Sequence, residues 1–365
     1  MTVTLVDVAA RARVSPATVS RVLNGNYPVA AATRERVLRA VDELDYVLNG
    51  PASSLAAATS DLVGILVNDI ADPFFGIIAG AAQTAIGERV TGRAGGEKLA
   101  VVCNTGGSAE RELTFLTLLQ RQRAAAVILT GGALEDPRHT AAVSAKLAKL
   151  AAGGTSVVLC GRPPLPCGPS TVTLTFDHRG GSRRLTEHLI ALGHRRIGYI
   201  AGPPDRTTTR QRLEGHRAAL AWAGIGGSDV DEGGHGTAAD RERLTVYGSY
   251  ERCSGFDATL ELLSRDPGLT AIAAANDTVA LGACAALREQ GLRVPEDVSV
   301  AGFDDLPFSA DTVPALTTVR LPLHMAGRRA GRLAVGAEKP PPGEAETIGA
   351  ELVARASTAP PPRAV

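Results

Sequence analysis

A short segment near the amino terminus, SPATVSRVLNG, combines small hydroxyl and amide side chains with one long cation. Hydroxyl and amide groups commonly bind DNA phosphates, and an arginine can hold the edge of a base in the major groove with two hydrogen bonds. The residues in question are Ser15, Thr18, Ser20, Arg21 and Asn24. Periodicity alone would favour a small helical bundle with a solvated polar face, but the identity of these residues favours contact with DNA.

Polar side chains also follow two apolar runs of strand length, in the sequences ANDT and GFDD. Ligands of open α/β sheets bind beyond the carboxyl ends of the parallel strands, which is where these side chains would lie. A carboxylate and an amide suit a ligand rich in hydroxyl groups, because each can hold two neighbouring polar atoms. The same side chains could instead cap the next helix or anchor a loop. The four residues are Asn276, Asp277, Asp304 and Asp305.

Enzyme chemistry fits the sequence less well. Asp304 and Asp305 are adjacent, so on an extended segment their side chains would diverge instead of flanking a bond as the carboxyl pair of a glycosidase does. Glu187, His188 and His194 lack the spacing of a metal site, and the glycine-bearing loops match neither a nucleophile elbow nor a phosphate-binding loop. We therefore expect a protein that is not an enzyme and that uses no cofactor and no metal.

Composition indicates a cytoplasmic protein. The five cysteines are odd in number and include no C-x-x-C pair, which fits a reduced compartment. The apolar runs are of strand length and the amino terminus lacks an apolar signal region, so we expect neither a membrane span nor export. The formal net charge is zero. The placement of charge, and not its total, would have to serve a nucleic acid partner.

Three short helices are predicted in the first sixty residues, where apolar residues recur at helical spacing. Ser15 followed by Pro16 signals the start of the second helix, because serine can cap free N–H groups and proline suits the first helical position. Two helices joined by a three-residue turn, with the second placed to enter a major groove, form a helix-turn-helix. The sequence therefore predicts an all-α DNA-binding domain at residues 1–48.

From Asp61 the pattern changes to apolar runs that alternate with longer amphipathic segments, as in parallel sheets with helical crossovers. The runs are LVGILV, KLAVVC, AAVILT, SVVLC, TVTLTF, RIGYIAG, LTVYG, TAIAAAND and VSVAGFDD. Roughly 280 residues exceed one such unit, so two lobes facing a cleft are expected. We predict a doubly wound α/β body at residues 61–358, a hinge at 49–60 and a disordered tail at 359–365. The proline-rich EKPPPGEAETIG is also expected to be loosely ordered.

Longer motifs occur in a recognisable order along the chain. LVDVAARARVSPATVSRVLNG comes first, and VGILVNDIADPFFGIIAGA, HLIALGHRRIGYIAGP and ANDTVALGACAALREQGLRVPEDVSVAGFDD follow. Together they resemble the LacI/GalR family of repressors over nearly the whole length. The resemblance implies a body like that of periplasmic binding proteins and a homodimer on near-palindromic operator DNA. It also implies a small-molecule effector, for which the polar residues favour a sugar.

The resemblance implies distinct roles within the second helix. Arg21 would read a base edge, while Pro16 and Ala17 occupy the positions that choose the operator sequence. Because neither residue has a side-chain donor, they would discriminate through apolar contact or DNA shape. The residues that would hold the DNA backbone are Thr18, Ser20 and Asn24.

A hinge helix that forms on operator binding is similar to the segment beginning at Asn49, and Leu55 lies where the family inserts a leucine into the minor groove. The chain departs from the family at Ser53, where arginine is usual, and at Arg13, where glycine is usual in the turn. Ala30 replaces the serine that usually caps the third helix. We expect positive φ at Arg13, at a cost of about 1 kcal/mol.

Effector-binding candidates also follow from the resemblance. Arg212 matches a pocket arginine, with a surface helix arginine as the alternative, and Tyr250 matches an aromatic residue that stacks on the ligand. The aromatic pair in DPFF would lie beside the effector, although such pairs are more often core residues. Asp277 and Asp305 would be structural. The full candidate set is Phe74, Phe75, Thr130, Arg212, Tyr250, Asn276 and Asp304.

Three alternatives to an effector-controlled repressor remain open at the level of sequence. The chain could be a solute-binding protein without a DNA role, an enzyme acting on a sugar or nucleoside, or a DNA-binding protein with an inactive effector pocket.

Two glycine-rich segments, near 87–97 and 224–240, are longer than the family pattern and have no predicted function.

Overall fold

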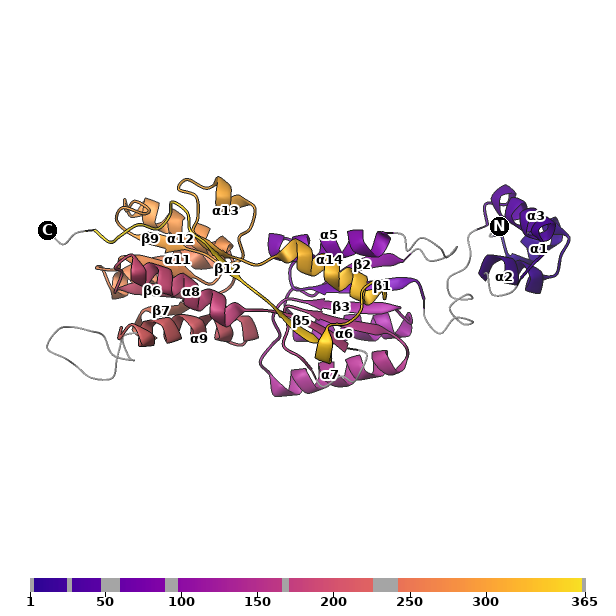
Figure 1. Ribbon diagram of the computed structural model, residues 1–365, viewed down its shortest axis with the longest axis horizontal. Coiled ribbons are helices and arrows are strands. Elements are labelled where there is room, and N and C mark those ends of the chain that lie inside the picture. Colours follow the sequence, from indigo (N-terminus) through magenta and orange to yellow (C-terminus); the bar gives the residue numbers. More distant parts are fainter. Residues whose placement is uncertain are drawn as a thin grey trace.

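The amino-terminal unit is a bundle of three short helices with its own hydrophobic core. The computed structural model describes residues 3–24, 28–46, 60–88, 98–165, 171–225 and 242–362. The three helices are α1 (Leu5–Ala12), α2 (Pro16–Asn24) and α3 (Ala31–Glu43). Val8, Val19 and Val37 are fully buried among them. The predicted helix-turn-helix is therefore confirmed (Figure 1).

The helix ends of this bundle differ in how they are capped. Thr4 and Asp7 form a reciprocal capping box at the start of α1. Arg13, which ends α1, has φ 56° and ψ 48°, so the positive φ expected at this turn is confirmed. Ala30 precedes α3 without a side-chain hydrogen bond, so α3 begins uncapped.

The first lobe is a parallel sheet of six strands in the order β11-β5-β4-β3-β1-β2. Its strands are β1 (Leu62–Val67), β2 (Leu99–Asn104), β3 (Ala126–Thr130), β4 (Ser156–Cys160), β5 (Thr171–Phe176) and β11 (Ala345–Ile348). Its helices are α5 (Pro73–Gly87), α6 (Ala109–Arg121), α7 (Pro137–Ala152) and α14 (Leu323–Ala334). α5 and α14 pack on one face, and α6 and α7 pack on the other (Figure 1).

The second lobe repeats this arrangement around a parallel sheet in the order β7-β6-β8-β9. Its strands are β6 (Ile197–Ala201), β7 (Thr245–Tyr247), β8 (Ala271–Ala274) and β9 (Ser299–Ala301). Its helices are α8 (His178–Ala191), α9 (Thr207–Trp222), α11 (Arg252–Arg265), α12 (Asp277–Glu289) and α13 (Phe308–Asp311). α8 and α9 cover one face of the sheet, and α11 and α12 cover the other. The prediction of a doubly wound, two-lobed α/β body is confirmed.

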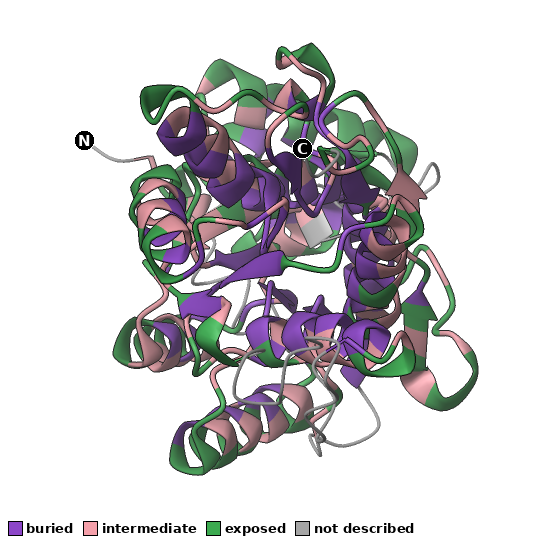
Figure 2. Cartoon of the chain, turned by 90° about the vertical axis from the view of Figure 1, so that its left-hand side faces the viewer, coloured by how far each residue is buried: buried purple, intermediate pink, exposed green. Residues whose placement is uncertain are grey.

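The described chain passes between the lobes after β5, before α14 and after β11. Two short strands, β10 (Thr318–Arg320) and β12 (Glu351–Val353), pair antiparallel next to the second and third crossings. Figure 2 shows that burial concentrates on the strands and on the inward faces of the helices. Among the helices of the described residues, none has the length and apolar character that a membrane span requires.

The carboxyl-terminal segments differ from the sequence prediction. The proline-rich stretch is ordered, because after a short 3₁₀ helix, η1 (Pro342–Glu344), its backbone joins the sheet as β11 beside β5. The prediction of a disordered tail from 359 is also wrong as far as residue 362. Ala359 exchanges hydrogen bonds with the Ser299 hydroxyl and accepts one from the His194 ring at 2.8 Å, which fixes the segment on the second lobe.

Some predicted features fall outside the described residues. They are most of the hinge at 49–60 and most of the glycine-rich segments near 87–97 and 224–240. Asn49, Ser53 and Leu55 are among these residues, so their predicted roles stay predictions.

Candidate functional site

The second helix of the bundle presents a polar, exposed surface beside its buried one. Val19 and Val22 face the core, whereas Pro16, Ala17 and Arg21 are exposed. Residues four apart on a helix share a face, so Ala17 and Arg21 lie together. The residues predicted to contact bases are thus exposed to solvent.

Two of the other predicted DNA contacts also support the helix itself. The Ser15 hydroxyl accepts a hydrogen bond from the Thr18 N–H at 3.2 Å, and the two hydroxyl groups lie 2.9 Å apart. Ser15 therefore caps α2 as predicted. Ser20 is half-buried, and the side chain of Asn24 lies outside the described residues.

In the body, a buried arginine stands at the centre of the predicted ligand site. Arg212 lies in α9 and donates from Nη2 to Asp304 Oδ1 at 2.8 Å, and Nη1 donates to the Ala275 carbonyl. Its Nε donates to His178 Nδ1 at 3.3 Å, and its guanidinium lies 3.9 Å from the centre of the Phe303 ring. Among the described residues, these bonds use three of its five N–H groups. The surface-arginine alternative is excluded, because Arg212 is only 4% exposed.

Close packing of two helices places this arginine. A Cβ atom on Gly215 would collide with the Arg179 carbonyl of α8, so only glycine lets α9 approach α8 so closely. Arg212 lies one turn earlier on α9 and is thereby held at the lobe boundary, next to the first residue of α8.

The acidic partner is held in an unusual backbone conformation. Asp304 follows β9 with φ 108°, and Asp305 has φ 55°. Consecutive positive φ values are costly for residues other than glycine and persist where surrounding contacts enforce them. Burial raises the pKa of the Asp304 carboxyl to about 8, although the Arg212 guanidinium lowers it.

The neighbouring aspartates have structural roles, as predicted. Asp277 accepts hydrogen bonds from the Leu306 N–H at 2.7 Å and from the hydroxyl groups of Ser309 and Thr318. Burial raises its pKa to about 6 despite these bonds. Asp305 pairs with Arg320 and Arg355, each at 2.7 Å.

Asn276 takes the capping role that the sequence left open. Its side-chain oxygen accepts the Val279 N–H at 2.8 Å at the start of α12, and its amide donates to the Tyr250 carbonyl at 3.4 Å. The Tyr250 hydroxyl lies 2.9 Å from that of Thr208 and 2.7 Å from that of Thr209. Both candidates thus serve the local fold, and a contact with an effector stays a prediction.

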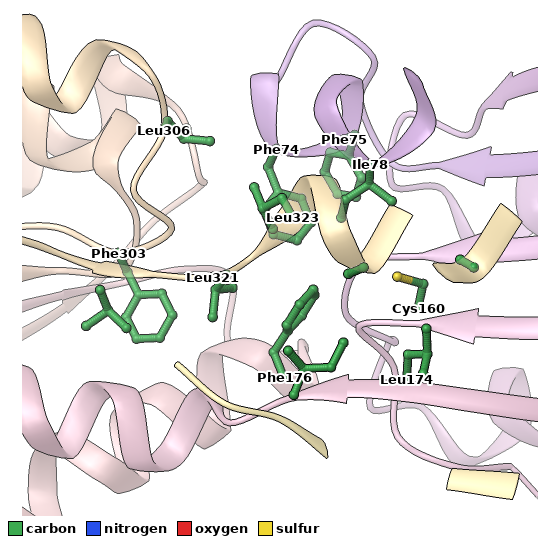
Figure 3. Close-up of a cluster of buried hydrophobic side chains, with 14 of the residues drawn as sticks. Phe74, Phe75, Ile78, Cys160, Leu174, Phe176, Phe303, Leu306, Leu321 and Leu323 are labelled. Atoms are coloured by element: carbon green, nitrogen blue, oxygen red, sulfur yellow. The ribbon is translucent and has the colours of Figure 1, made fainter. Parts of the chain in front are cut away.

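Aromatic rings from both lobes lie at the lobe boundary, and the Phe303 ring packs on the arginine. Phe74 and Phe75, at the start of α5, meet edge to face with ring centres 5.0 Å apart, and Phe74 lies 6.5 Å from Phe176. Figure 3 shows Phe176 at the end of β5 and Phe303 on the opposite side of the lobe boundary. The phenylalanine pair therefore belongs to the core where that core meets the boundary.

Thr130 is the candidate that the structure supports least. Its side chain is fully buried, and its hydroxyl donates to the Leu66 carbonyl at 2.8 Å within the sheet. The hydroxyl therefore satisfies a backbone group of β1.

Sequence reasoning missed four residues of this centre. Phe176 and His178 flank the crossing from β5 to α8, Phe303 precedes Asp304, and Asp72 caps α5 by accepting the Phe74 N–H at 2.9 Å. The available signal was the motif TFDHRG, an aromatic residue and a histidine around a helix cap at the carboxyl end of a strand. Within the described residues, no cluster of histidine, cysteine and acidic side chains is arranged to hold a metal ion.

Known proteins share this combination of a helical bundle and a two-lobed body. Residues 4–49 match the bacterial regulatory proteins of the lacI family, and residues 186–358 match the periplasmic binding protein-like domain. The HTH-type transcriptional regulator CelR of Thermobifida fusca is 37% identical over 91% of this chain and 91% of its own length. The chain belongs to the LacI family.

Solved structures of LacI-family proteins agree with this assignment. The Lac repressor dimer bound to operator and the anti-inducer ONPF is similar with a TM-score of 0.73 and 28% identity, over 98% of this chain and all of that chain. The CelR–cellobiose complex has a TM-score of 0.65 and 34% identity, over 97% and 99% of the two chains. This LacI-family chain is thus a DNA-binding transcriptional regulator with a ligand-binding body.

Proposed function

We propose that this regulator is a repressor that binds a near-palindromic operator as a homodimer through α2. Arg21 reads a base edge, and Pro16 and Ala17 select the sequence around it. The exposure of these three residues on α2 supports the proposal. The backbone contacts come from Ser15, Thr18, Ser20 and Asn24, and hinge contacts come from Asn49 and Leu55. The operator-bound dimer of the related Lac repressor supports the same assembly.

The effector of this regulator is a sugar that binds at the lobe boundary beside Arg212 and Asp304. The observation that carries this proposal is the buried ion pair, with Nη2 and Oδ1 2.8 Å apart and the Phe303 ring packed on the guanidinium, at a boundary that Phe74 and Phe176 line from the other lobe. Aromatic rings suit the apolar faces of a sugar, while the charged pair suits its hydroxyl groups. The cellobiose complex of the related CelR supports a sugar as the class of ligand.

Binding of the sugar regulates DNA binding only if it favours one conformation of the body over the other. The effector binds more tightly to a lobe arrangement in which the two DNA-binding domains of the dimer cannot bind the operator at the same time. It leaves chemically unchanged, because the site serves recognition and not turnover. The protein carries out this role in the cytoplasm, where the operator and the sugar are both present.

Selection of bound sequences from random duplex DNA, at two salt concentrations, tests the DNA part of the proposal. Enrichment of a near-palindromic site at both concentrations is the expected result. Binding that depends steeply on salt and enriches no sequence would contradict it, because phosphate contacts alone behave in that way.

Thermal unfolding in the presence of cellobiose, maltose or galactose tests the effector part. A ligand at 100 times its Kd stabilises the folded state by about 2.7 kcal/mol, which raises the melting temperature measurably. No shift with any of the three sugars at 10 mM would contradict a sugar effector from this group.

A further inference from the structure

A buried histidine stands at the edge of the proposed effector site and has a role that the fold alone does not explain. His178 is the first residue of α8, immediately after the Asp177 cap, and is 3% exposed. Its ring lies 5.9 Å from the ring of Phe176 and 6.0 Å from the ring of Phe303. It therefore lies at the lobe boundary between these two rings, one of which, Phe303, packs on the Arg212 guanidinium.

The hydrogen bonds of His178 define its tautomer. Burial and the nearby charge of Arg212 hold the pKa of His178 well below its usual value, so the ring is neutral. A neutral imidazole has one acceptor nitrogen and one donor nitrogen. Nδ1 is the acceptor, because Arg212 Nε donates to it at 3.3 Å. The proton therefore resides on Nε2.

That Nε2–H group is buried and has no hydrogen-bond partner among the described residues. A buried donor without an acceptor is destabilising, and such groups are rare in folded proteins unless a ligand or water completes them. Arg212 also keeps two N–H groups beyond its three bonds to the described residues. Two residues in direct contact at this boundary thus each keep unused donors.

We propose that His178 Nε2–H donates a hydrogen bond to an oxygen atom of the bound effector and is a specificity-determining residue of the site. The inference rests on the proposed function, because it assigns one contact to the sugar described above. The contact requires an acceptor oxygen, which is a hydroxyl oxygen of the sugar. It rejects a cationic amine at the same position, since the amine would face donors of Arg212 and His178.

Two substitutions separate this role from mere support of Arg212. In His178→Asn the amide reaches about as far as Nδ1 and can still accept from Arg212, but nothing replaces Nε2. In His178→Gln the amide reaches the position of Nε2 and can donate there, but the acceptor at Nδ1 is lost. If Nε2–H donates to the effector, His178→Gln should bind the effector more tightly than His178→Asn. If His178 only accepts a hydrogen bond from Arg212, His178→Asn should bind more tightly.

The experiment is calorimetric titration of the full-length protein with cellobiose, or with maltose or galactose if that sugar binds more tightly. We expect His178→Asn to weaken binding about tenfold, the loss of one hydrogen bond, and His178→Gln to stay within about threefold of the natural protein. The reverse order, equal losses or no loss in either variant would overturn the inference. Thermal unfolding without sugar confirms that each variant is folded.

Deoxy sugars give an independent test if either variant fails to fold. In the natural protein, one deoxy derivative of the bound sugar should bind about tenfold more weakly, and the amino derivative at that position should bind more weakly still. Equal affinity for the deoxy and amino derivatives at every position would overturn the inference. If the natural protein binds none of the three sugars, the proposed effector class fails and this inference fails with it; binding with an unaffected His178→Asn variant overturns this inference alone.

Discussion

At the scale of single residues, the ligand-binding body contains a buried ion pair between Arg212 and Asp304. Asp304 and Arg212 are each about as buried as the surrounding core, and Asp304 accepts a strained backbone to reach its partner. Burying charges is costly, and removing one partner of such a pair leaves the other uncompensated. Apolar residues of similar volume often make such a position more stable, so the pair supports the proposed role in ligand recognition.

The acidity of Asp304 leads to a prediction about effector binding. Burial raises the pKa of the Asp304 carboxyl to about 8 although Arg212 lowers it, so the ion pair with Arg212 is favoured at pH 9 and is progressively lost to protonation of the carboxyl as the pH falls. If effector hydroxyl groups donate to the carboxylate, affinity rises with pH, by about tenfold between pH 7 and pH 9. Calorimetric titration over this range measures the change. Asp304→Asn should show no such rise, and a flat profile in the natural protein would contradict the assignment.

Operator recognition is assigned to one arginine. Arg21→Ala should weaken specific operator binding by about 10- to 100-fold, as expected for the loss of a two-bond contact with a base, and should leave sugar binding unchanged. Fluorescence anisotropy with the selected operator measures the loss. Arg21→Lys is the matched control, since it keeps the charge but lacks the planar fork of the guanidinium. Its affinity for random DNA should stay close to that of the natural protein, and equal operator affinity in all three proteins would contradict the role of Arg21.

At the scale of elements, the DNA-binding domain contains a helix, α3, that lacks a side-chain cap and that a single substitution can stabilise. Ala30→Ser should supply the missing cap of α3 and stabilise the DNA-binding domain by about 1 kcal/mol. Hydrogen exchange of the α3 amides in the full-length protein should slow about fivefold, while exchange in the body stays the same. Unchanged or faster exchange in α3 would show that residue 30 does not cap the helix.

An ion pair in the first lobe joins α6 to the loop after β4. Arg162 donates to both carboxylate oxygens of Glu112, at 2.9 and 2.7 Å, and His139 lies 3.6 Å from one of them. Burial raises the pKa of Glu112, but Arg162 and His139 outweigh it and hold the pKa at about 2. A carboxyl group with a lowered pKa stabilises the fold above its usual pKa, and this contribution is lost as pH falls from about 4.5 to 2.

Glu112→Gln should therefore be less stable than the natural protein at pH 7, by about 3 kcal/mol or more, because Arg162 is left buried without its partner. The difference should shrink as the pH falls toward 3. Urea unfolding of both proteins at pH 7 and pH 3 measures it. A difference that stays constant with pH would show that the pair contributes no pH-dependent stability.

The elements differ in how far the sequence predicts them. All nine apolar runs form strands. Most of these strands are buried on both faces, so little polar patterning interrupts the run, whereas β2 is an edge strand with alternating exposure. β10, β11 and β12 were missed, since these short strands lie at edges or crossings and mix polar with apolar residues. The order of the segment from 359 to 362 was not predicted. Hydrogen bonds between the Ala359 backbone and the Ser299 hydroxyl hold this segment, and such bonds leave no apolar pattern in the sequence.

The same contrast applies to the candidate site. Arg212 and Asp304 were predicted from motifs and do meet, whereas Asn276, Tyr250 and Thr130 proved to satisfy local hydrogen bonds. The residues that were missed come from chain segments that only the two-lobed fold brings together. Proximity of this kind depends on tertiary packing, and periodicity does not reveal it.

At the scale of the whole molecule, the two lobes touch through the start of α9, the helix that also carries Arg212 of the proposed effector site. Arg206 of the second lobe donates to the Gly107 carbonyl of the first at 2.8 Å, and Arg210 pairs with Glu135 at 2.6 Å. The Thr207 N–H donates to the Ala133 carbonyl at 3.0 Å. A ligand at Arg212 and Asp304 changes the balance between lobe arrangements only through such differential contacts, which makes the body a suitable sensor.

Operator affinity with and without the sugar is the measurement that tests this account most directly. The operator from the selection experiment is titrated with the natural protein and with Asp304→Ala, in the absence and presence of the sugar that binds best. We predict equal operator affinity for the two proteins without sugar, and release of the operator by sugar from the natural protein alone. Equal release from both proteins would show that the effector acts somewhere other than the Arg212–Asp304 pair, and no release from the natural protein would contradict control by this sugar.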